Sequence, residues 1–225
     1  MYFFIRFSEC VFKFIFEDST GAIIKTMAKY LIGIDEVGRG PLAGPITIGV
    51  VVVPQKRKNL FVGIKDSKAL SVSKREEWFK ALQGHTRGNR MFYAISSVSH
   101  AVIDKIGIVP ATRLAISRSL KKIAKKNVRI GSKSARVLLD GGLKAPREYA
   151  NQQTIIRGDK QIPIIAAASI MAKVMRDRKM MRLAREYPQY GFDIHKGYGT
   201  KAHMRALKKY GLSNIHRKSF CGRFI

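Results

Sequence analysis

Cysteine is nearly absent from this chain of 225 residues, and it has no long apolar run. The two cysteines, Cys10 and Cys221, lie near opposite ends, so they provide neither a disulfide framework nor the paired spacing of a zinc site. No apolar run reaches the roughly 18 residues that a transmembrane helix needs. Residues 1–16 are rich in Phe and Ile, but charges interrupt them and no signal-peptide cleavage site follows. We therefore expect a cytoplasmic protein that has no membrane partner.

Acidic residues are also scarce. The chain has 15 Asp and Glu against 43 Lys and Arg, which gives a formal net charge of +28 at pH 7. Such a surplus favours a polyanionic partner, because Lys and Arg side chains that neutralise phosphates release the counterions held there. Charge alone does not distinguish a nuclease from a basic RNA- or ribosome-binding module without catalysis, so both interpretations stay open.

The length and the apolar content of 46% predict one large domain. The run Met27-Ala28-Lys29-Tyr30 leads directly into the first predicted strand, as a natural start would. We therefore expect the functional protein to begin at Met27. Residues 1–26 are then an N-terminal extension or a mis-assigned start, and residues 27–225 form the domain, its C-terminal helical segment included.

Apolar segments and turn residues alternate along this domain, which predicts an α/β fold. Strands are expected at 31–36, 46–53, 91–98, 136–140 and 153–156. Helices are expected from 71 or 73 to 82 and at 100–106, 110–126, 162–186 and 200–210, with a loop at 187–198. Ser73 and Glu76 have the spacing of a capping box. Because no helix separates the first two strands, they are expected to pair antiparallel in a mixed sheet.

Four of the few acids stand at strand ends or beside glycines: Asp35, Glu36, Asp140 and Asp159. Ligands of α/β sheets gather at the carboxyl ends of strands, so carboxylates from neighbouring strands converge there. A cluster of carboxylates alone selects hard divalent cations, and two such ions about 4 Å apart can promote phosphodiester cleavage. In a regular strand Asp35 and Glu36 point to opposite faces, so we expect irregular backbone at 36–40 if both serve one site.

Two other charged groups have simpler interpretations. Asp177 lies between Arg176 and Arg178 on the long predicted helix, and we expect it to pair with these arginines rather than to join the acidic site. Four lysines crowd the end of the helix at 110–126, where a solvated helix end and a phosphate contact are both open interpretations. These lysines are Lys121, Lys122, Lys125 and Lys126.

Several short segments, taken in order, resemble one family. Residues 35–40, Asp-Glu-Val-Gly-Arg-Gly, resemble the signature of type 2 ribonucleases H, the bacterial ribonuclease HII group. The likeness covers residues 28–222 and continues, in the same order as in the family, through 66–68, 139–141, 158–159, 166–174, 195–200 and 216–220. One departure is Gly142, which stands where many members have asparagine.

The resemblance implies an RNase H-like fold: a central mixed sheet flanked by helices, with a small helical part at the C-terminus. It also implies hydrolysis of the RNA strand of RNA–DNA hybrids. The same family incises duplex DNA on the 5′ side of a single embedded ribonucleotide and leaves a 3′-hydroxyl and a 5′-phosphate. The implied cofactors are two Mn²⁺ or Mg²⁺ ions, the implied partners are these two kinds of nucleic acid, and we expect a monomer.

The resemblance also assigns roles to residues. The acids that bind metal and carry out catalysis correspond to Asp35, Glu36, Asp140 and Asp159. The backbone groups that contact the 2′-hydroxyl correspond to Gly38, Arg39 and Gly40. Only RNA offers this hydroxyl, and glycine lets the main chain approach it closely. Tyr198 corresponds to the tyrosine that packs against the sugar at the RNA–DNA junction.

Some polar residues are candidates for phosphate contact only. They are Ser67, Lys68 and Lys173, the last of which lies four residues after Ser169 on one helix face. The histidines at 195, 203 and 216 lack the paired spacing of metal ligands, so we expect phosphate contact or capping from them. A nuclease of the same fold that acts on DNA junctions is a third interpretation, against which the glycine turn and Tyr198 argue.

Overall fold

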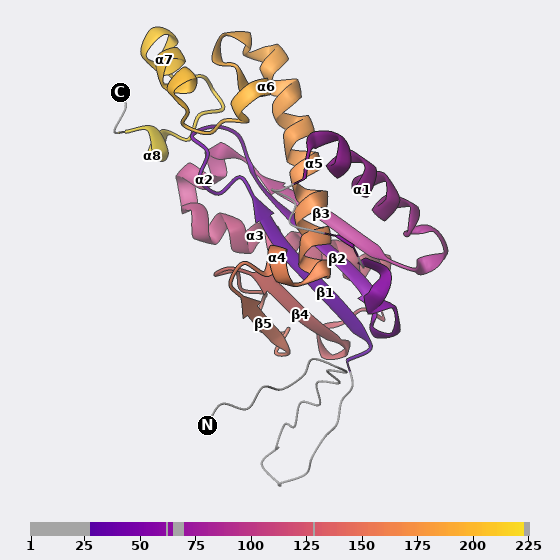
Figure 1. Cartoon of the computed structure of the whole chain (residues 1–225). Helices are drawn as coiled ribbons and strands as arrows, with labels where there is room; N and C mark the ends of the chain where they lie inside the picture. The colour runs from indigo at the N-terminus through magenta and orange to yellow at the C-terminus, as the bar shows by residue number, and fades with distance from the viewer. Residues whose placement is uncertain (1–27, 62, 65–69, 128, 223–225) are drawn as a thin grey trace, which may run out of the picture.

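The computed structural model describes residues 28–61, 63–64, 70–127 and 129–222 (Figure 1). The predicted extension at 1–26 lies outside the described residues, and so do Ser67 and Lys68. Within these described ranges, no helix is both long enough and apolar enough to cross a membrane.

The described residues form a mixed sheet with the strand order β3-β2-β1-β4-β5, which confirms the predicted α/β class. β2 pairs antiparallel with both β1 and β3, whereas β4 runs parallel to β1 and to β5. The strands are β1 (Tyr30–Val37), β2 (Ile46–Pro54), β3 (Phe92–Val98), β4 (Ala135–Asp140) and β5 (Gln152–Ile155). The central position of β1 therefore places its carboxyl end between an antiparallel and a parallel neighbour.

Helices cover both faces of this sheet. The apolar residues of β1 and β2 alternate: Ile32 and Ile34 pack toward α2 and α3, whereas Val51 and Val53 pack toward α1 and α5. The helices are α1 (Val72–Gly84), α2 (His100–Ile106), α3 (Ile108–Lys126), α4 (Gly158–Gln161), α5 (Pro163–Glu186), α6 (Phe192–His195), α7 (Lys201–Tyr210) and α8 (Lys218–Cys221). Short 3₁₀ turns are η1 (Gln55–Phe61), η2 (Arg87–Asn89), η3 (Ser132–Ser134) and η4 (Pro188–Tyr190).

The long helix α5 lies directly on β1 and β2 because two strand glycines leave room for it. A Cβ atom on Gly33 would stand 2.4 Å from the carbonyl oxygen of Ile164, and a Cβ on Gly49 would stand 2.2 Å from that of Ala168. Real Cβ atoms do not approach that closely, so any side chain at either position would push the helix away. The alanine-rich start of α5 completes this close contact from the helix side.

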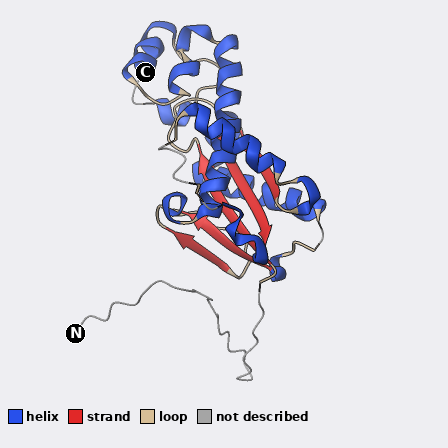
Figure 2. Cartoon of the chain, turned by 45° about the vertical axis from the view of Figure 1, so that its right-hand side comes forward, coloured by secondary structure: helices blue, strands red, loops and turns tan. Residues whose placement is uncertain are grey.

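The C-terminal cap, which we define as residues 187–222, forms a separate group of helices beyond one end of the sheet (Figures 1 and 2). It packs on the second half of α5 through its own apolar cluster, which includes Tyr190, Phe192 and Leu207. The cap contains η4 and α6 within 187–198, so the prediction of a loop there was wrong. Each of these elements is about one turn long, too short to produce a helical period in the sequence.

The predicted element positions are otherwise close to the observed ones. Helix α1 is capped by Ser71, whose Oγ accepts a hydrogen bond from the N–H of Lys74 at 3.2 Å, so the predicted capping box at Ser73 was wrong. The long helix begins at Pro163, and Asp159 stands on the separate short helix α4.

Candidate active site

Three aspartates meet at the carboxyl end of the parallel strands. Asp35, Asp140 and Asp159 each offer a carboxylate oxygen, and these oxygens all lie within 4.8 Å of one another. The ladder explains the first contact, because Ile34 of β1 is the register partner of Leu139 of β4, and the next residue on each strand is an aspartate. We call these three residues the acidic triad.

The side chain of Asp140 holds the third aspartate, Asp159, in place by accepting hydrogen bonds from backbone amides at the start of α4. The Oδ1 of Asp140 accepts a hydrogen bond from the N–H of Gly158 at 2.6 Å and a longer one from the N–H of Asp159 at 3.4 Å. The carboxylate of β4 therefore binds the first turn of α4, which carries Asp159. One aspartate thus orients another, and the triad forms from two strands and one short helix.

The triad brings three acidic groups together, of which Asp35 and Asp159 are buried and Asp140 is partly exposed. Asp35 is 3% exposed, and burial is the main reason that its pKa is raised to about 8. The charges of Glu36 and Asp140 raise the pKa further, although hydrogen bonds from Ser169 and from the N–H of Glu36 act in the opposite direction. A bound cation would relieve this repulsion, and three convergent carboxylate oxygens suit a hard divalent ion.

Glu36 stands outside this group of three. Strand β1 keeps its regular pairing with β2 as far as Val37 and Thr47, so the predicted irregularity at 36 and 37 was wrong. The backbone leaves the strand geometry from Gly38 onward, where φ is 91°, so the prediction is confirmed at 38–40. The Glu36 side chain is partly exposed, and its Oε1 lies 4.0 Å from an Nη atom of Arg39.

Two buried arginines lie beneath residues 38–45, which we call the glycine turn. Arg217 donates hydrogen bonds to the carbonyl oxygens of Gly38, Arg39 and Gly44. Arg176 donates to the carbonyl oxygens of the turn's last residues, Ala43 and Pro45. Neither arginine was among the predicted site residues. No local pattern marks them, because their partners lie 131 to 179 positions away in the chain.

This geometry agrees with a comparison of the chain with known protein families. The family model described as Ribonuclease HII matches residues 32–223, which span the acidic triad, the glycine turn and the cap. The chain belongs to the ribonuclease HII family. Its activity is that of the family, endonucleolytic cleavage of RNA in RNA–DNA hybrids.

Individual ribonuclease HII proteins are similar over most of their length. The Ribonuclease HII of Endomicrobium trichonymphae is 44% identical over 188 residues, which cover 84% of this chain and 83% of that protein. The Ribonuclease HII of Coxiella burnetii (strain Dugway 5J108-111) is 42% identical over 198 residues, with 87% and 91% covered. Both matches extend well beyond the acidic residues.

Solved structures share the fold. The ribonuclease H2 from Pyrococcus horikoshii OT3 is similar with a TM-score of 0.60 and 27% identity, over 87% of this chain and 98% of that one. Bst-RNase HIII in complex with Mn²⁺ has a TM-score of 0.64 at 18% identity, over 87% of this chain and 68% of that one. The fold of this ribonuclease HII is therefore RNase H-like, as the sequence resemblance implied.

Tyr198, the tyrosine predicted to contact the substrate, lies on the cap. Tyr198 is 43% exposed, and its carbonyl oxygen is bonded to Nδ1 of the buried His203 at 2.9 Å. The side chain is open to solvent, whereas its backbone is fixed from inside the cap. The guanidinium carbon of Arg176 lies 5.9 Å from the centre of the tyrosine ring.

The three cap histidines form a buried network rather than a phosphate-binding surface. The rings of His195 and His203 stack with centres 4.4 Å apart, and Nε2 of His203 lies 3.0 Å from Nε2 of His216. Burial lowers the pKa of each of the three, that of His216 to about 4. Of the two predicted roles, burial argues against phosphate contact and the hydrogen bonds favour capping: backbone N–H groups of Gly197 and Ser213 donate to Nδ1 of His195 and of His216.

The ion pairs around α5 differ from those predicted. Asp177 accepts a hydrogen bond from Nζ of Lys173 at 2.9 Å and lies 3.7 Å from Arg75. Arg178 pairs instead with Glu76 at 2.6 Å. Asp177 stays outside the acidic triad as predicted, but the prediction that it pairs with Arg176 and Arg178 was wrong.

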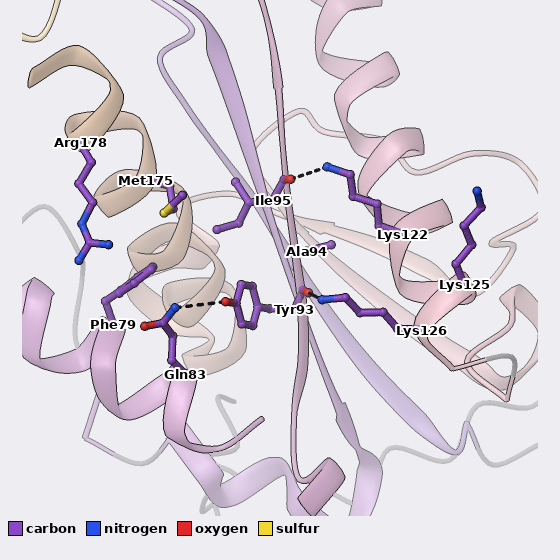
Figure 3. A pocket seen from close by; sticks show the side chains of 10 residues that line it. All are labelled: Phe79, Gln83, Tyr93, Ala94, Ile95, Lys122, Lys125, Lys126, Met175 and Arg178. Atoms are coloured by element: carbon purple, nitrogen blue, oxygen red, sulfur yellow. Dashed lines mark hydrogen bonds between the residues drawn. The ribbon is translucent and has the colours of Figure 1, made fainter. Parts of the chain in front are cut away.

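Two of the four lysines at the end of α3, Lys122 and Lys126, have structural partners. Lys122 donates a hydrogen bond to the carbonyl oxygen of Ile95 at 2.9 Å, and Lys126 donates to that of Tyr93 at 3.2 Å (Figure 3). Both carbonyls belong to β3, the edge strand, so these lysines cover polar groups that would otherwise be open to another strand. The cleft around them, which Lys125 also lines, contains no member of the acidic triad.

Proposed function

We propose that this ribonuclease HII also incises duplex DNA on the 5′ side of a single embedded ribonucleotide and leaves a 3′-hydroxyl and a 5′-phosphate. The observation that carries the proposal is the position of the glycine turn, which directly follows β1 and begins three residues after Asp35 and two after Glu36. Because the turn is attached to the strand that carries Asp35 and Glu36, it can contact the sugar next to the phosphodiester bond that is cut. The strong positive charge of the chain supports binding to long nucleic acids.

Two divalent ions, Mn²⁺ or Mg²⁺, are the proposed cofactors, held by Asp35, Glu36, Asp140 and Asp159. When bound, such ions activate a water molecule and stabilise the charge on the leaving oxygen. The acidic triad supplies oxygen ligands at fixed positions, because Asp35 and Asp140 stand on paired strands. We include Glu36 as a fourth ligand because it is adjacent in sequence and its charge already acts on Asp35.

Substrate recognition is assigned to the glycine turn and to Tyr198. The backbone groups of Gly38, Arg39 and Gly40 are the proposed contacts of the 2′-hydroxyl, and Arg39 and Gly40 are both exposed. The ring of Tyr198 offers an apolar face to a sugar. Ser67 and Lys68 remain proposed phosphate contacts, and Lys173 becomes one only if the phosphate replaces Asp177 as its partner.

A duplex that contains one ribonucleotide tests this function directly. Incubation with Mg²⁺ or Mn²⁺, followed by mapping of the product ends, should give one cut on the 5′ side of the ribonucleotide. The same duplex made entirely of DNA is the control and should stay intact. Cleavage of the all-DNA duplex would favour a DNA-junction nuclease, and binding without cleavage under any divalent ion would favour the RNA-binding module.

The bounds of the catalytic domain, its oligomeric state and its location are proposals as well. We propose that residues 27–225 act as one monomeric catalytic domain in the cytoplasm and that the functional protein begins at Met27, with residues 1–26 an extension or a mis-assigned start. The match of the family model from residue 32 onward supports this division. N-terminal sequencing of the native protein and its mass in solution test the two statements; peptides from 1–26 or a dimer mass would contradict them.

A further inference from the structure

The glycine turn is held from below by a buried cation that comes from the other end of the chain. Arg217 is fully buried, and its guanidinium donates through three of its nitrogens. Nη2 bonds the carbonyl oxygen of Gly38 at 2.6 Å, and Nη1 bonds that of Arg39 at 2.9 Å. Nε bonds the carbonyl oxygen of Gly44, at the far end of the turn, at 3.0 Å.

Because of the geometry of the peptide group, these contacts also fix the direction of two backbone N–H groups. In a trans peptide the carbonyl and the N–H of the following residue point in nearly opposite directions, and the described residues contain no cis peptide. Because the carbonyls of Gly38 and Arg39 point inward to Arg217, the N–H groups of Arg39 and Gly40 point outward. Two neighbouring donors are therefore directed away from the protein interior.

The main chain around Arg217 fixes the guanidinium before any substrate arrives. The N–H of Arg217 bonds the carbonyl oxygen of Leu42 at 2.7 Å, and the N–H of Gly44 bonds that of Ile215 at 2.9 Å. The guanidinium also stacks over the ring of Phe220, with 5.1 Å between its carbon and the ring centre. The donor fork thus has little freedom to rotate, and the carbonyls that it binds have little freedom as well.

This arrangement is expensive for stability alone. Among the described residues, no carboxylate lies within salt-bridge distance of Arg217 or of the neighbouring buried Arg176. Burial and the nearby positive charge lower the pKa of Arg217 to about 10. Apolar side chains of similar size would fill this space at a smaller desolvation cost. The rigid fork of donors is what an apolar residue, or a lysine, would not provide.

We propose that Arg217 is a positioning residue that presets the N–H groups of Arg39 and Gly40 as a pair of donors for the ribose 2′-hydroxyl. The inference rests on the proposed function of the glycine turn, and it assigns the preference for a ribonucleotide over a deoxyribonucleotide to a side chain that need not touch the substrate. A site built to hydrogen-bond a hydroxyl discriminates strongly against the analogue that lacks it. Arg217 keeps that site in shape.

The test measures binding preference in a protein that does not cut. Asp35→Asn is combined with Arg217→Lys, and affinity is measured for a duplex with one ribonucleotide and for the same duplex made entirely of DNA. We expect the preference for the ribonucleotide to fall about tenfold, because the outward donors lose their fixed direction. Affinity for the all-DNA duplex should change less than about twofold, because phosphate contacts are unaffected.

Matched controls separate the possible failures. Arg185→Lys, an exposed substitution in the last turn of α5, should leave both affinities and the melting temperature unchanged. If Asp35→Asn alone shows no preference for the ribonucleotide, the proposed function fails. If that preference exists and survives Arg217→Lys, the role of Arg217 is overturned. A parallel loss of both affinities would also overturn it, since that is the result of a purely structural role.

A second measurement needs no substitution at Arg217. In the Asp35→Asn protein, the amide resonances of Arg39 and Gly40 should shift when the ribonucleotide duplex binds and should shift far less with the all-DNA duplex. Equal shifts with both duplexes, or none with either, would overturn the assignment. This measurement keeps the proposal testable even if Arg217→Lys does not fold.

Discussion

The acidic triad and the glycine turn both adjoin the carboxyl end of β1, but the protein builds them in different ways. The triad follows from regular structure: two parallel strands in register and one short helix bring three carboxylates together. The turn has no regular structure, and its carbonyls are held by Arg217 from 178 and 179 positions away. Regular secondary structure thus positions the groups proposed to bind metal, and side-chain contacts to an irregular turn position the groups proposed to recognise the sugar.

The largest effect is expected from neutralising the triad. Asp35→Asn keeps the shape of the side chain but removes a charge that a divalent ion needs, so cleavage of a one-ribonucleotide duplex should fall at least about a thousandfold. Duplex affinity should stay within about threefold, since the cap and the turn are intact. Asp193→Asn, on the exposed surface of α6, is the control and should cut normally. Residual activity close to that of the unchanged protein would separate the triad from the chemistry.

The contact between α5 and the sheet comes next, because it supports both regions. Gly49→Ala would place a Cβ 2.2 Å from the carbonyl oxygen of Ala168, and overpacking of this kind should lower the free energy of unfolding by about 3 kcal/mol. Gly84→Ala, where a Cβ meets nothing within 4 Å, should be neutral or raise it by up to about 1 kcal/mol. Denaturant unfolding of both variants measures the difference. Equal stabilities would mean that α5 has room to move.

A pH titration tests the cap specifically. The pKa of His216 is about 4 in the folded protein, below its ordinary value of 6.5, so the unfolded chain binds more protons between these two values. Stability is therefore retained above about pH 6.5 and is lost as the pH falls toward 4. We expect a fall of about 2 kcal/mol in the free energy of unfolding between pH 7 and pH 5.

The substitution His216→Asn should reduce this pH dependence, because it removes the histidine whose pKa is lowered most while retaining a donor and an acceptor; His195 and His203 keep the remainder. The same substitution at His85, at the end of α1, serves as the control and should leave the slope unchanged. An unchanged slope in His216→Asn would assign the acid sensitivity to another group.

The smallest effect is expected from the exposed ring of the cap. Tyr198→Ala removes the aromatic face but leaves the backbone bond to His203, so kcat/KM on the one-ribonucleotide duplex should fall about tenfold. The melting temperature should change little, because the ring is 43% exposed. Tyr210→Ala, a similarly exposed tyrosine on α7, is the control. A loss of equal size at both positions would indicate a general effect of the cap.

The contrast between the two regions also explains what the sequence could predict. Asp35 and Asp140 were predictable because each ends an apolar strand, and strand ends converge in an α/β sheet. Asp159 was assigned through the family resemblance, since its own neighbours only indicated a glycine break. The mixed sheet and the long helix followed from apolar patterns that extend over many residues.

Long-range contacts left no such pattern. Arg217 stands in a basic segment of a basic chain, so nothing local shows that its side chain is buried. Asp177 was expected to pair with adjacent arginines, yet it faces Lys173 one helical turn away, because neighbours in a helix point in different directions. The short elements of the cap depend on left-handed backbone at Gly191 and Lys196, which hydrophobic periodicity does not reveal.

The bridge between Ala43 and His216 joins the two ends of the described fold. During synthesis, all three members of the triad leave the ribosome before the segment that holds the turn. At about 5–20 residues per second, the interval between Asp159 and Arg217 is a few seconds. We expect the three triad residues to be available in a growing chain before the segment that holds the glycine turn, so the order of synthesis separates the two parts of the site in time.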